Sequence, residues 1–169
     1  IHFGVETGTD EGLSKLKKDI NTDMVRKAFR LCKKAGIITI SNFIIGLPWE
    51  KKEDMFKTVK FANEIGADFA EFQILTPYPK TELYETRIQE GKFNDFWLEF
   101  AKNPNTDFRL RTCNDYYNRE ELFVLLEQCL KKFYFNPRRA IKILFQIKSG
   151  KELMTKAKAG LALFNFKEM

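Results

Sequence analysis

Residues that hold metals are scarce in this sequence. It has one histidine, His2, and three cysteines that lie far apart, Cys32, Cys113 and Cys129. A metal or cluster site needs several nitrogen or thiolate ligands at close spacing, so no site formed wholly by this chain is expected. Ser-His-Asp chemistry is disfavoured as well, because there is one histidine and no nucleophile-elbow motif. Neither a phosphate-binding Walker loop nor a dinucleotide fingerprint occurs.

Long apolar runs are also missing. No stretch reaches the roughly 18 apolar residues of a bilayer-spanning helix. The chain starts at Ile1, and no charged segment followed by an apolar one precedes the first strand, so we expect no signal peptide and interpret the chain as a fragment of a longer protein. An odd number of widely spaced cysteines is typical of a reducing compartment. These features predict a cytoplasmic location.

Positive charge is concentrated at the C-terminal end. Residues 1–130 contain 19 Lys and Arg against 21 Asp and Glu, whereas residues 131–169 contain 10 against 2. A basic tail can meet nucleic acid, acidic lipid or an acidic partner domain, and a solvated basic face explains it equally well. The tail has the pattern of amphipathic helices and not of a known RNA-binding module, so nucleic acid is an unlikely partner.

The spacing of apolar residues predicts strands that alternate with helices in the first half of the chain. "IITISNFIIG" is almost wholly apolar and β-branched, as in a strand buried on both faces. "NTDMVRKAFRLCKKAG" has apolar residues at helical spacing and ends at a glycine. A region rich in aromatic residues, 92–117, is expected to be irregular. The predicted strands are 1–6, 37–46 and 68–75, and the predicted helices are 10–18, 21–36, 51–66, 81–91, 119–134, 136–149 and 150–164.

This order of elements defines the expected fold class. Strands joined by helices of about a dozen residues must be parallel, with right-handed crossovers. We therefore predict an α/β fold with three parallel strands in sequence order and helices on one face only. Such a sheet is either small and open or part of a (β/α) barrel. An all-helical region follows it.

Polar residues interrupt each of the three apolar strands. Glu6 shares a strand face with Gly4, because side chains alternate along a strand. Asn42 is the polar residue of the middle strand, and Glu71 and Gln73 share one face of the third. Buried polar groups are costly without a partner, so a common binding face is favoured over a purely structural network.

Three motifs in series resemble the C-terminal half of the radical S-adenosylmethionine (SAM) barrel. They are "FGVETGTDEGLSKLKK", "AGIITISNFIIGLPWEKKEDMFKTVKFANEIGADF" and "FQILTPYPKTELYE". The tail "LEQCLKKFYFNPRRAIKILFQIKSGKELMTKAKAGLALF" is similar to the helical extension of the cobalamin-binding branch, which includes the anaerobic magnesium-protoporphyrin monomethyl ester cyclase type. The resemblance divides the chain into a half-barrel, residues 1–85, and a helical extension, residues 86–169.

The resemblance implies that the chain starts at the fourth strand of a (β/α)6 partial TIM barrel. The family's Cys-x-x-x-Cys-x-x-Cys loop, which holds the 4Fe-4S cluster, and its cobalamin domain both come earlier and are absent here. The full-length enzyme would cleave SAM reductively to a 5′-deoxyadenosyl radical, with cobalamin assisting. A cyclase- or methyltransferase-like reaction on a tetrapyrrole, lipid or other small molecule is expected. The fragment would be inactive alone, with the missing cobalamin domain and cluster-binding half-barrel as partners.

The resemblance also assigns SAM-binding residues, without any catalytic or metal-binding ones. Glu6 and Thr7 match the motif that meets the ribose and methionine region. Lys17 matches a position that is usually an arginine, which pairs with the methionine carboxylate. A lysine carries a point charge and cannot form the bidentate hydrogen bonds of a guanidinium. Trp49 replaces a common glycine. The set is completed by Asn42 near the ribose hydroxyls, Gly46 against adenine, Gln73 of the third strand, and the backbone of Ile74, Leu75 and Thr76 beside adenine.

Two other interpretations stay open. A radical SAM enzyme that modifies tRNA would explain the basic tail. A non-enzymatic interaction module that keeps only the half-barrel would explain the absent cysteine motif. In either case the half-barrel has an exposed strand edge, which could pair with a second copy of the chain.

Overall fold

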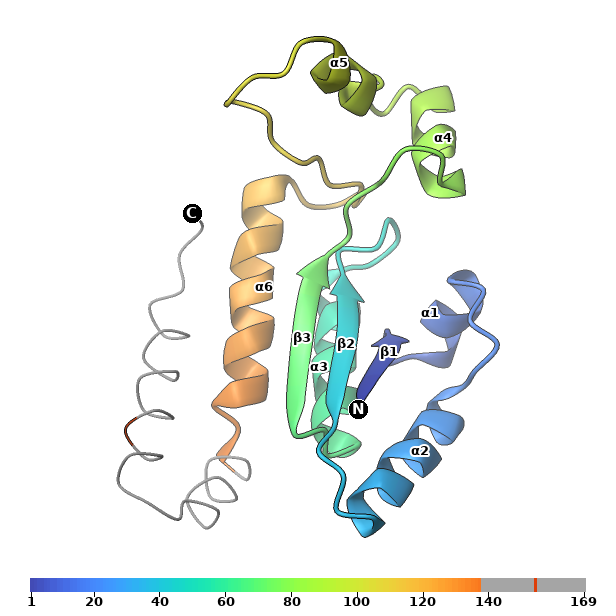
Figure 1. The fold of residues 1–169 in the computed structure, drawn as a ribbon, viewed down its shortest axis with the longest axis vertical. Coiled ribbons are helices and arrows are strands. Elements are labelled where there is room, and N and C mark those ends of the chain that lie inside the picture. The colour runs from blue at the N-terminus through green and yellow to red at the C-terminus, as the bar shows by residue number, and fades with distance from the viewer. Residues whose placement is uncertain (138–153, 155–169) are drawn as a thin grey trace.

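Three parallel strands form the centre of the protein, whose computed structural model describes residues 1–137 and Met154 (Figure 1). The hydrogen-bonded order is β1-β2-β3, as predicted from the sequence. A three-stranded parallel sheet is compatible with part of a barrel, and the described residues contain no further strand of one. The strands are β1 (His2–Glu6), β2 (Ile40–Ile45) and β3 (Phe69–Ile74).

Helices with well-formed caps connect and follow the strands. The Asn21 side chain caps α2 by accepting a hydrogen bond from the Met24 N–H at 2.9 Å. Asn118 and Glu121 form a reciprocal capping box at the start of α6. The described helices are α1 (Asp10–Lys15), α2 (Thr22–Lys34), α3 (Lys52–Glu64), α4 (Glu82–Gln89), α5 (Phe96–Lys102) and α6 (Arg119–Tyr134).

The core lies on one face of the sheet. Val5, Phe43 and Phe72 point to this face from β1, β2 and β3, and all three are buried. α3 and α6 cover it and also pack against each other, while Phe29 of α2 contacts Phe3 at the side. Figure 1 shows α3 behind the sheet. Burial of these apolar side chains is the main source of stability for the sheet.

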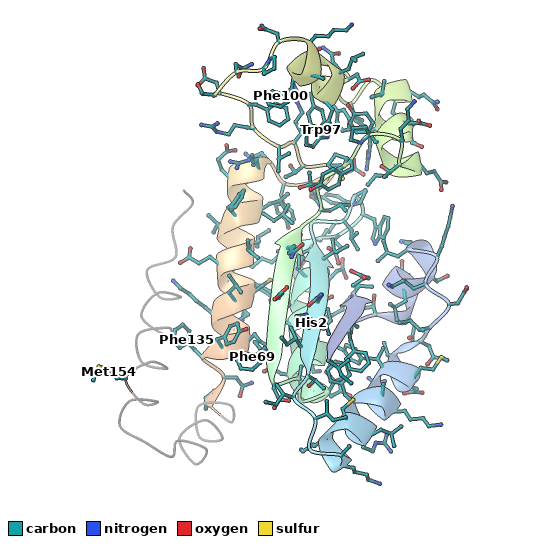
Figure 2. The ribbon with its side chains drawn as sticks, in the orientation of Figure 1. His2, Phe69, Trp97, Phe100, Phe135 and Met154 are labelled. Carbon is teal, nitrogen blue, oxygen red and sulfur yellow. The ribbon has the colours of Figure 1, made fainter. Side chains whose placement is uncertain are left out.

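The opposite face of the sheet carries polar and exposed side chains. His2 and Phe69 stand at its amino-terminal end (Figure 2), and Phe69 is 50% exposed. Glu71 and Gln73 continue along β3 and are exposed as well. The prediction of helices on one face only is therefore confirmed for the part of the chain that the structure describes.

A second apolar cluster packs beyond the carboxyl ends of the strands. It joins α4 and α5 through Tyr84, Phe93, Phe96 and Cys113. The prediction that 92–117 is irregular was wrong for α5, because a helix of seven residues is too short for a periodic signal. Tertiary contacts hold it instead: the Phe96 ring packs 5.6 Å from that of Tyr84. Cys113, in the segment between α5 and α6, is buried in this cluster.

The end of α1 also differs from the sequence prediction. α1 ends at Lys15, short of the predicted residue 18, because Lys17 adopts a left-handed backbone conformation with φ of 54°.

At the far edge of β3, the Tyr134 hydroxyl donates to the Ala70 carbonyl at 2.9 Å and accepts from the Ala70 N–H at 3.3 Å. This side chain occupies backbone groups to which another strand would pair.

The predicted helices 136–149 and 150–164 fall outside the described residues, apart from the first residues of one and Met154. The division at residues 85 and 86 stays a prediction. None of the helices in the described part is long and apolar enough to cross a bilayer.

Candidate cofactor-binding face

Glu6 ends β1 on the open face of the sheet. The strand is irregular at this point, since the register with β2 shifts between Gly4 and Glu6, and Glu6 has a φ of 72°. The carboxylate lies over Gly4, where an added Cβ would come within 2.7 Å of Glu6 Oε1. Glu6 and Gly4 thus share a face, as the alternation predicts. A side chain at position 4 would displace the carboxylate.

Lys18 is the cation beside Glu6. Its Nζ lies 3.1 Å from Glu6 Oε1, and the two side chains are only 35% and 23% exposed. The sequence comparison with the radical SAM pattern pointed to the neighbouring residue, Lys17, and missed Lys18. Position in the sequence alone could not tell which of the two adjacent lysines faces the sheet. The left-handed turn at Lys17 decides this.

Asn42 occupies the middle of the open face. It pairs in register with Gly4 of β1 and Glu71 of β3, so the three residues form a row across the sheet. Its Oδ1 atom is buried and has no hydrogen-bond donor among the described residues. A buried acceptor without a donor costs about 1–3 kcal/mol, so this atom is placed to receive a hydrogen bond from a bound group.

Lys17 and Thr7 lie apart from this row. Lys17 is exposed, and its Nζ forms an ion pair with Glu82 at 2.6 Å, which links the turn after α1 to α4. Thr7 is buried, with its Oγ1 3.3 Å from Thr58 Oγ1 of α3. The N–H of Gly8 donates to the same Thr58 hydroxyl at 3.0 Å. The Thr7 side chain therefore packs toward α3 and away from the open face.

The loop after β2 turns at Gly46, which has a φ of 73°. A Cβ at this position would meet Leu122 of α6 at 3.0 Å, so the space that glycine leaves is filled by α6. The half-buried Ile74, Leu75 and Thr76, at the end of β3 and just beyond it, lie at the same end of the sheet. The Leu75 N–H donates to the Ile45 carbonyl at 3.0 Å.

Glu50 is a buried carboxyl in the same loop, and the sequence reasoning missed it. It is 2% exposed, and its Oε2 accepts a hydrogen bond from the Leu47 N–H at 3.1 Å. Burial raises the pKa of Glu50 to about 7, although hydrogen bonds from the backbone of Leu47 and Gly46 oppose the shift. Its signal in the sequence is one acid at the end of the otherwise uncharged run "IIGLPWE".

Asn114 fastens this loop to the segment before α6. Its Nδ2 donates to the carbonyls of Leu47 at 2.6 Å and Glu50 at 2.9 Å, and its Oδ1 accepts from the Tyr117 N–H at 2.9 Å. All of its hydrogen-bonding atoms are therefore used to hold backbone. Asn114 and Glu50 together fix the turn at the carboxyl end of β2.

The three cysteines do not form a ligand set. Cys32, Cys113 and Cys129 are all buried and free, in different parts of the fold. Burial raises the pKa of Cys113 to about 11 and of Cys129 to about 12, so these thiols stay protonated at neutral pH. Within residues 1–137, no group of three or more His, Cys, Asp or Glu side chains is arranged to hold a metal ion.

The chain was compared with known proteins. No family model matches it. An uncharacterised methyltransferase of Pyrococcus horikoshii is 30% identical over 146 residues, which are 86% of this chain and 31% of the relative. Bacteriochlorophyllide d C-8(2)-methyltransferase of Chlorobaculum tepidum is 28% identical over 138 residues, 76% of this chain and 30% of the relative.

Other matches cover a smaller share of the chain. The anaerobic magnesium-protoporphyrin IX monomethyl ester cyclase of Rubrivivax gelatinosus is 29% identical over 96 residues, 57% of this chain and 17% of the relative. A match to a tRNA-2-methylthio-N(6)-dimethylallyladenosine synthase covers 48% of the chain. This chain spans about a third or less of the length of each of these relatives.

Proposed function

This chain is homologous to enzymes of the radical SAM family, and on that premise we propose that its sheet is the C-terminal half of a radical SAM barrel and forms one side of the SAM site. The observation that carries the proposal is the row of Gly4, Asn42 and Glu71 on the open face, with the buried Asn42 Oδ1 lacking a donor. In β/α barrels the active site lies at the carboxyl ends of the strands, and Glu6 stands at that end of β1 on the same face as Gly4.

The residues on the open face fit the polar groups of SAM. The ribose hydroxyls are donors, and they would satisfy the acceptor of Asn42. Glu6 offers a second acceptor at the strand end, and Lys18 Nζ lies 3.1 Å from its Oε1. Lys17 would meet the methionine carboxylate only after leaving its exposed ion pair with Glu82. Bound SAM would supply a 5′-deoxyadenosyl radical when the enzyme's cluster reduces it.

The described residues do not fit an iron–sulfur cluster, because their cysteines are buried and lie in different parts of the fold. We therefore assign no step of the chemistry to a cluster held by them. In this proposal the cluster and cobalamin are bound by other parts of the protein. Those parts would cover the open face and pair with the outer edge of β1; a second copy of the chain is the alternative occupant of that edge.

A methyl transfer is the reaction class that we favour. The matches to two proteins named as methyltransferases extend over 86% and 76% of the chain and so reach into its second half. Those to the cyclase and the tRNA-modifying synthase cover 57% and 48%. The substrate would be a small molecule, with cobalamin as the methyl carrier. Modification of tRNA is the second candidate, supported by the shorter matches and the basic C-terminal end.

SAM binding to the complete, cluster-loaded protein tests the proposal. Glu6→Ala should weaken SAM binding about ten- to a hundredfold, since one charge-assisted hydrogen bond contributes about 1.5–3 kcal/mol. Glu6→Gln keeps the shape and part of the hydrogen bonding, so it should lose less. Glu11→Gln on α1, an exposed acid paired with Lys15, is the matched control and should bind normally.

The outcomes test both the role of Glu6 and the SAM site itself. Equal affinity in the wild type and both Glu6 variants would remove Glu6 from the site. A loss of thermal stability without a loss of affinity would give Glu6 a structural role only. Failure of the wild-type protein to bind SAM at all would favour a non-catalytic interaction module.

A further inference from the structure

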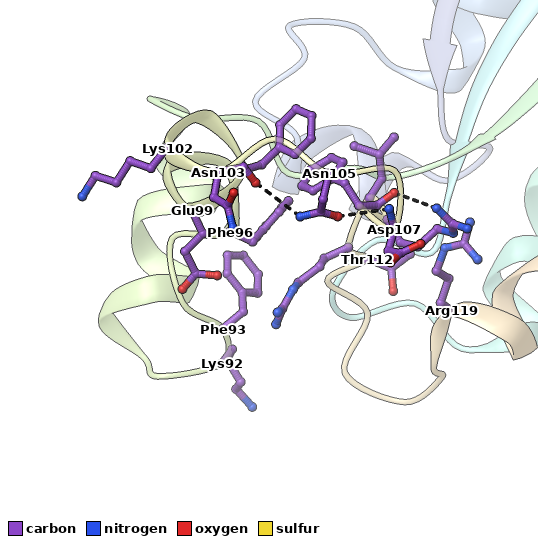
Figure 3. A pocket seen from close by; sticks show the side chains of 15 residues that line it. Lys92, Phe93, Phe96, Glu99, Lys102, Asn103, Asn105, Asp107, Thr112 and Arg119 are labelled. Atoms are coloured by element: carbon purple, nitrogen blue, oxygen red, sulfur yellow. Dashed lines mark hydrogen bonds between the residues drawn. The ribbon is translucent and has the colours of Figure 1, made fainter.

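A cavity lies in the lobe beyond the carboxyl ends of the strands (Figure 3). Its volume is about 860 Å³, within the range of roughly 300–1,000 Å³ that is usual for ligand pockets. It is bounded by the start of the loop after α4, by α5, and by residues 103–112. No residue of the proposed SAM face lines it, so it is a separate site.

Aromatic rings make up the apolar wall of this cavity. Phe93 and Phe96 belong to the buried cluster of the lobe, with ring centroids 5.4 Å apart. Phe108 stacks on Phe100 at 4.1 Å and on Phe96 at 6.1 Å. Both Phe93 and Phe96 project toward the cavity in Figure 3. Stacked phenyl rings of this kind favour a flat, apolar ligand body.

The rest of the lining is predominantly basic. Its acids are Glu99 and Asp107, whereas its cations are Lys92, Lys102, Arg109, Arg111 and Arg119. A concave surface with an excess of one charge concentrates its field and attracts ligands of the opposite charge. The cavity is therefore suited to an anion.

Arg111 is the cation with the most free hydrogen-bonding capacity. Its guanidinium lies over the Phe96 ring, 5.5 Å from the centroid, and forms no ion pair with any residue in the described part of the chain. Arg109, by contrast, donates to the carbonyls of Thr106 and Phe108. A guanidinium without an ion pair keeps its N–H donors for a carboxylate, sulfonate or phosphate.

Polar contacts on both sides hold the frame of the cavity. Arg87, which is buried, donates to both carboxylate oxygens of Asp115 at 2.8 and 3.1 Å, and also to the Cys113 carbonyl at 3.2 Å. The Tyr84 hydroxyl donates to Asp95 at 2.5 Å, just before α5. The segment with Arg111 is thus tied to α4, and so is α5.

We propose that this cavity binds an organic anion with a flat apolar body and one acidic group. The rings of Phe93, Phe96 and Phe108 would contact the body, and the Arg111 guanidinium would pair with the acid. The lobe stands beyond the same end of the strands as the proposed cofactor face (Figure 1). That this ligand is the enzyme's substrate rests on the proposed function; that the cavity binds it does not.

A pair of dyes with the same body tests the two parts of the proposal. The probe is 8-anilinonaphthalene-1-sulfonate, and N-phenyl-1-naphthylamine is its counterpart without the acid. The complete protein is titrated with each dye at neutral pH and followed by fluorescence. The variants are Arg111→Ala, Arg111→Lys and, as the control, Arg30→Ala, which removes an exposed arginine of α2.

We expect the wild type to bind the sulfonate about tenfold or more tightly than the neutral dye. Arg111→Ala should remove this preference and leave the neutral dye unaffected, because one charge-assisted contact is lost. Arg111→Lys should retain part of it, and Arg30→Ala all of it. Equal binding of the sulfonate by wild type and Arg111→Ala, or no binding of either dye, would overturn the proposal. SAM affinity is measured separately, so either proposal can fail alone.

Discussion

Glu50 makes the stability of the protein depend on pH in an unusual direction. Its carboxyl is buried at the carboxyl end of β2, and burial raises its pKa from 4.5 to about 7. In the unfolded chain the group ionises near its ordinary pKa. Between pH 4.5 and about 7, the folded protein therefore holds a proton that the unfolded chain has released, so the free energy of unfolding falls as pH rises.

The size of this effect follows from the shift. Each pKa unit corresponds to about 1.4 kcal/mol, so the full shift makes the contribution of Glu50 about 3 kcal/mol less favourable at pH 8 than at pH 4. Glu50→Gln removes the titration and keeps an oxygen that can accept from the Leu47 N–H. The variant should thus gain stability relative to the wild type as pH rises, with most of the change between pH 5 and 7.

Urea denaturation of both proteins at several pH values from 4 to 8 measures this difference. Subtracting the two curves cancels the other carboxyl groups, whose pKa shifts have the opposite sign where they are ion-paired, as for Asp54 beside Lys57. Glu53→Gln on α3, which removes an exposed carboxyl, is the control for the loss of one negative charge. Parallel curves for wild type and Glu50→Gln would refute the assignment of a raised pKa to Glu50.

Two further substitutions test the ends and edges of the sheet. Gly46→Ala should destabilise the protein by about 2–3 kcal/mol in denaturant titrations, because it adds left-handed strain and brings a Cβ within 3.0 Å of Leu122; unchanged stability would mean that the turn can rearrange. Tyr134→Phe should cost about 1–2 kcal/mol by leaving the Ala70 N–H and carbonyl without this partner. If the hydroxyl also protects the edge of β3, size-exclusion chromatography should show more self-association in this variant than in the wild type.

Local patterns predicted the strands and the face that each presents. Side-chain alternation along β1 placed Glu6 with Gly4, and the structure confirms it, since the carboxylate lies directly over that glycine. Alternation in β3 likewise placed Glu71 and Gln73 on the open side. These predictions held because a strand has only two faces, and a buried helix-covered face selects the apolar set.

The same reasoning could not place residues in turns. Thr7 directly follows Glu6, yet it is buried against Thr58 of α3. Lys17 and Lys18 are chemically alike, and the left-handed turn directs one to Glu82 and the other to Glu6. Such directions depend on one or two backbone dihedral angles, which no periodic pattern records.

The sequence by itself determined the parallel α/β order and the polar row on one face of the sheet, because both follow from local periodicity and from the length of the crossovers. Only the tertiary structure decided which groups meet across the chain. It buried Glu50 among backbone donors and left Asn42 Oδ1 without a donor. It also placed the Arg111 guanidinium over the Phe96 ring in the lining of a cavity. These features are set by contacts between residues far apart in sequence or by burial, and both arise only once the whole chain has packed.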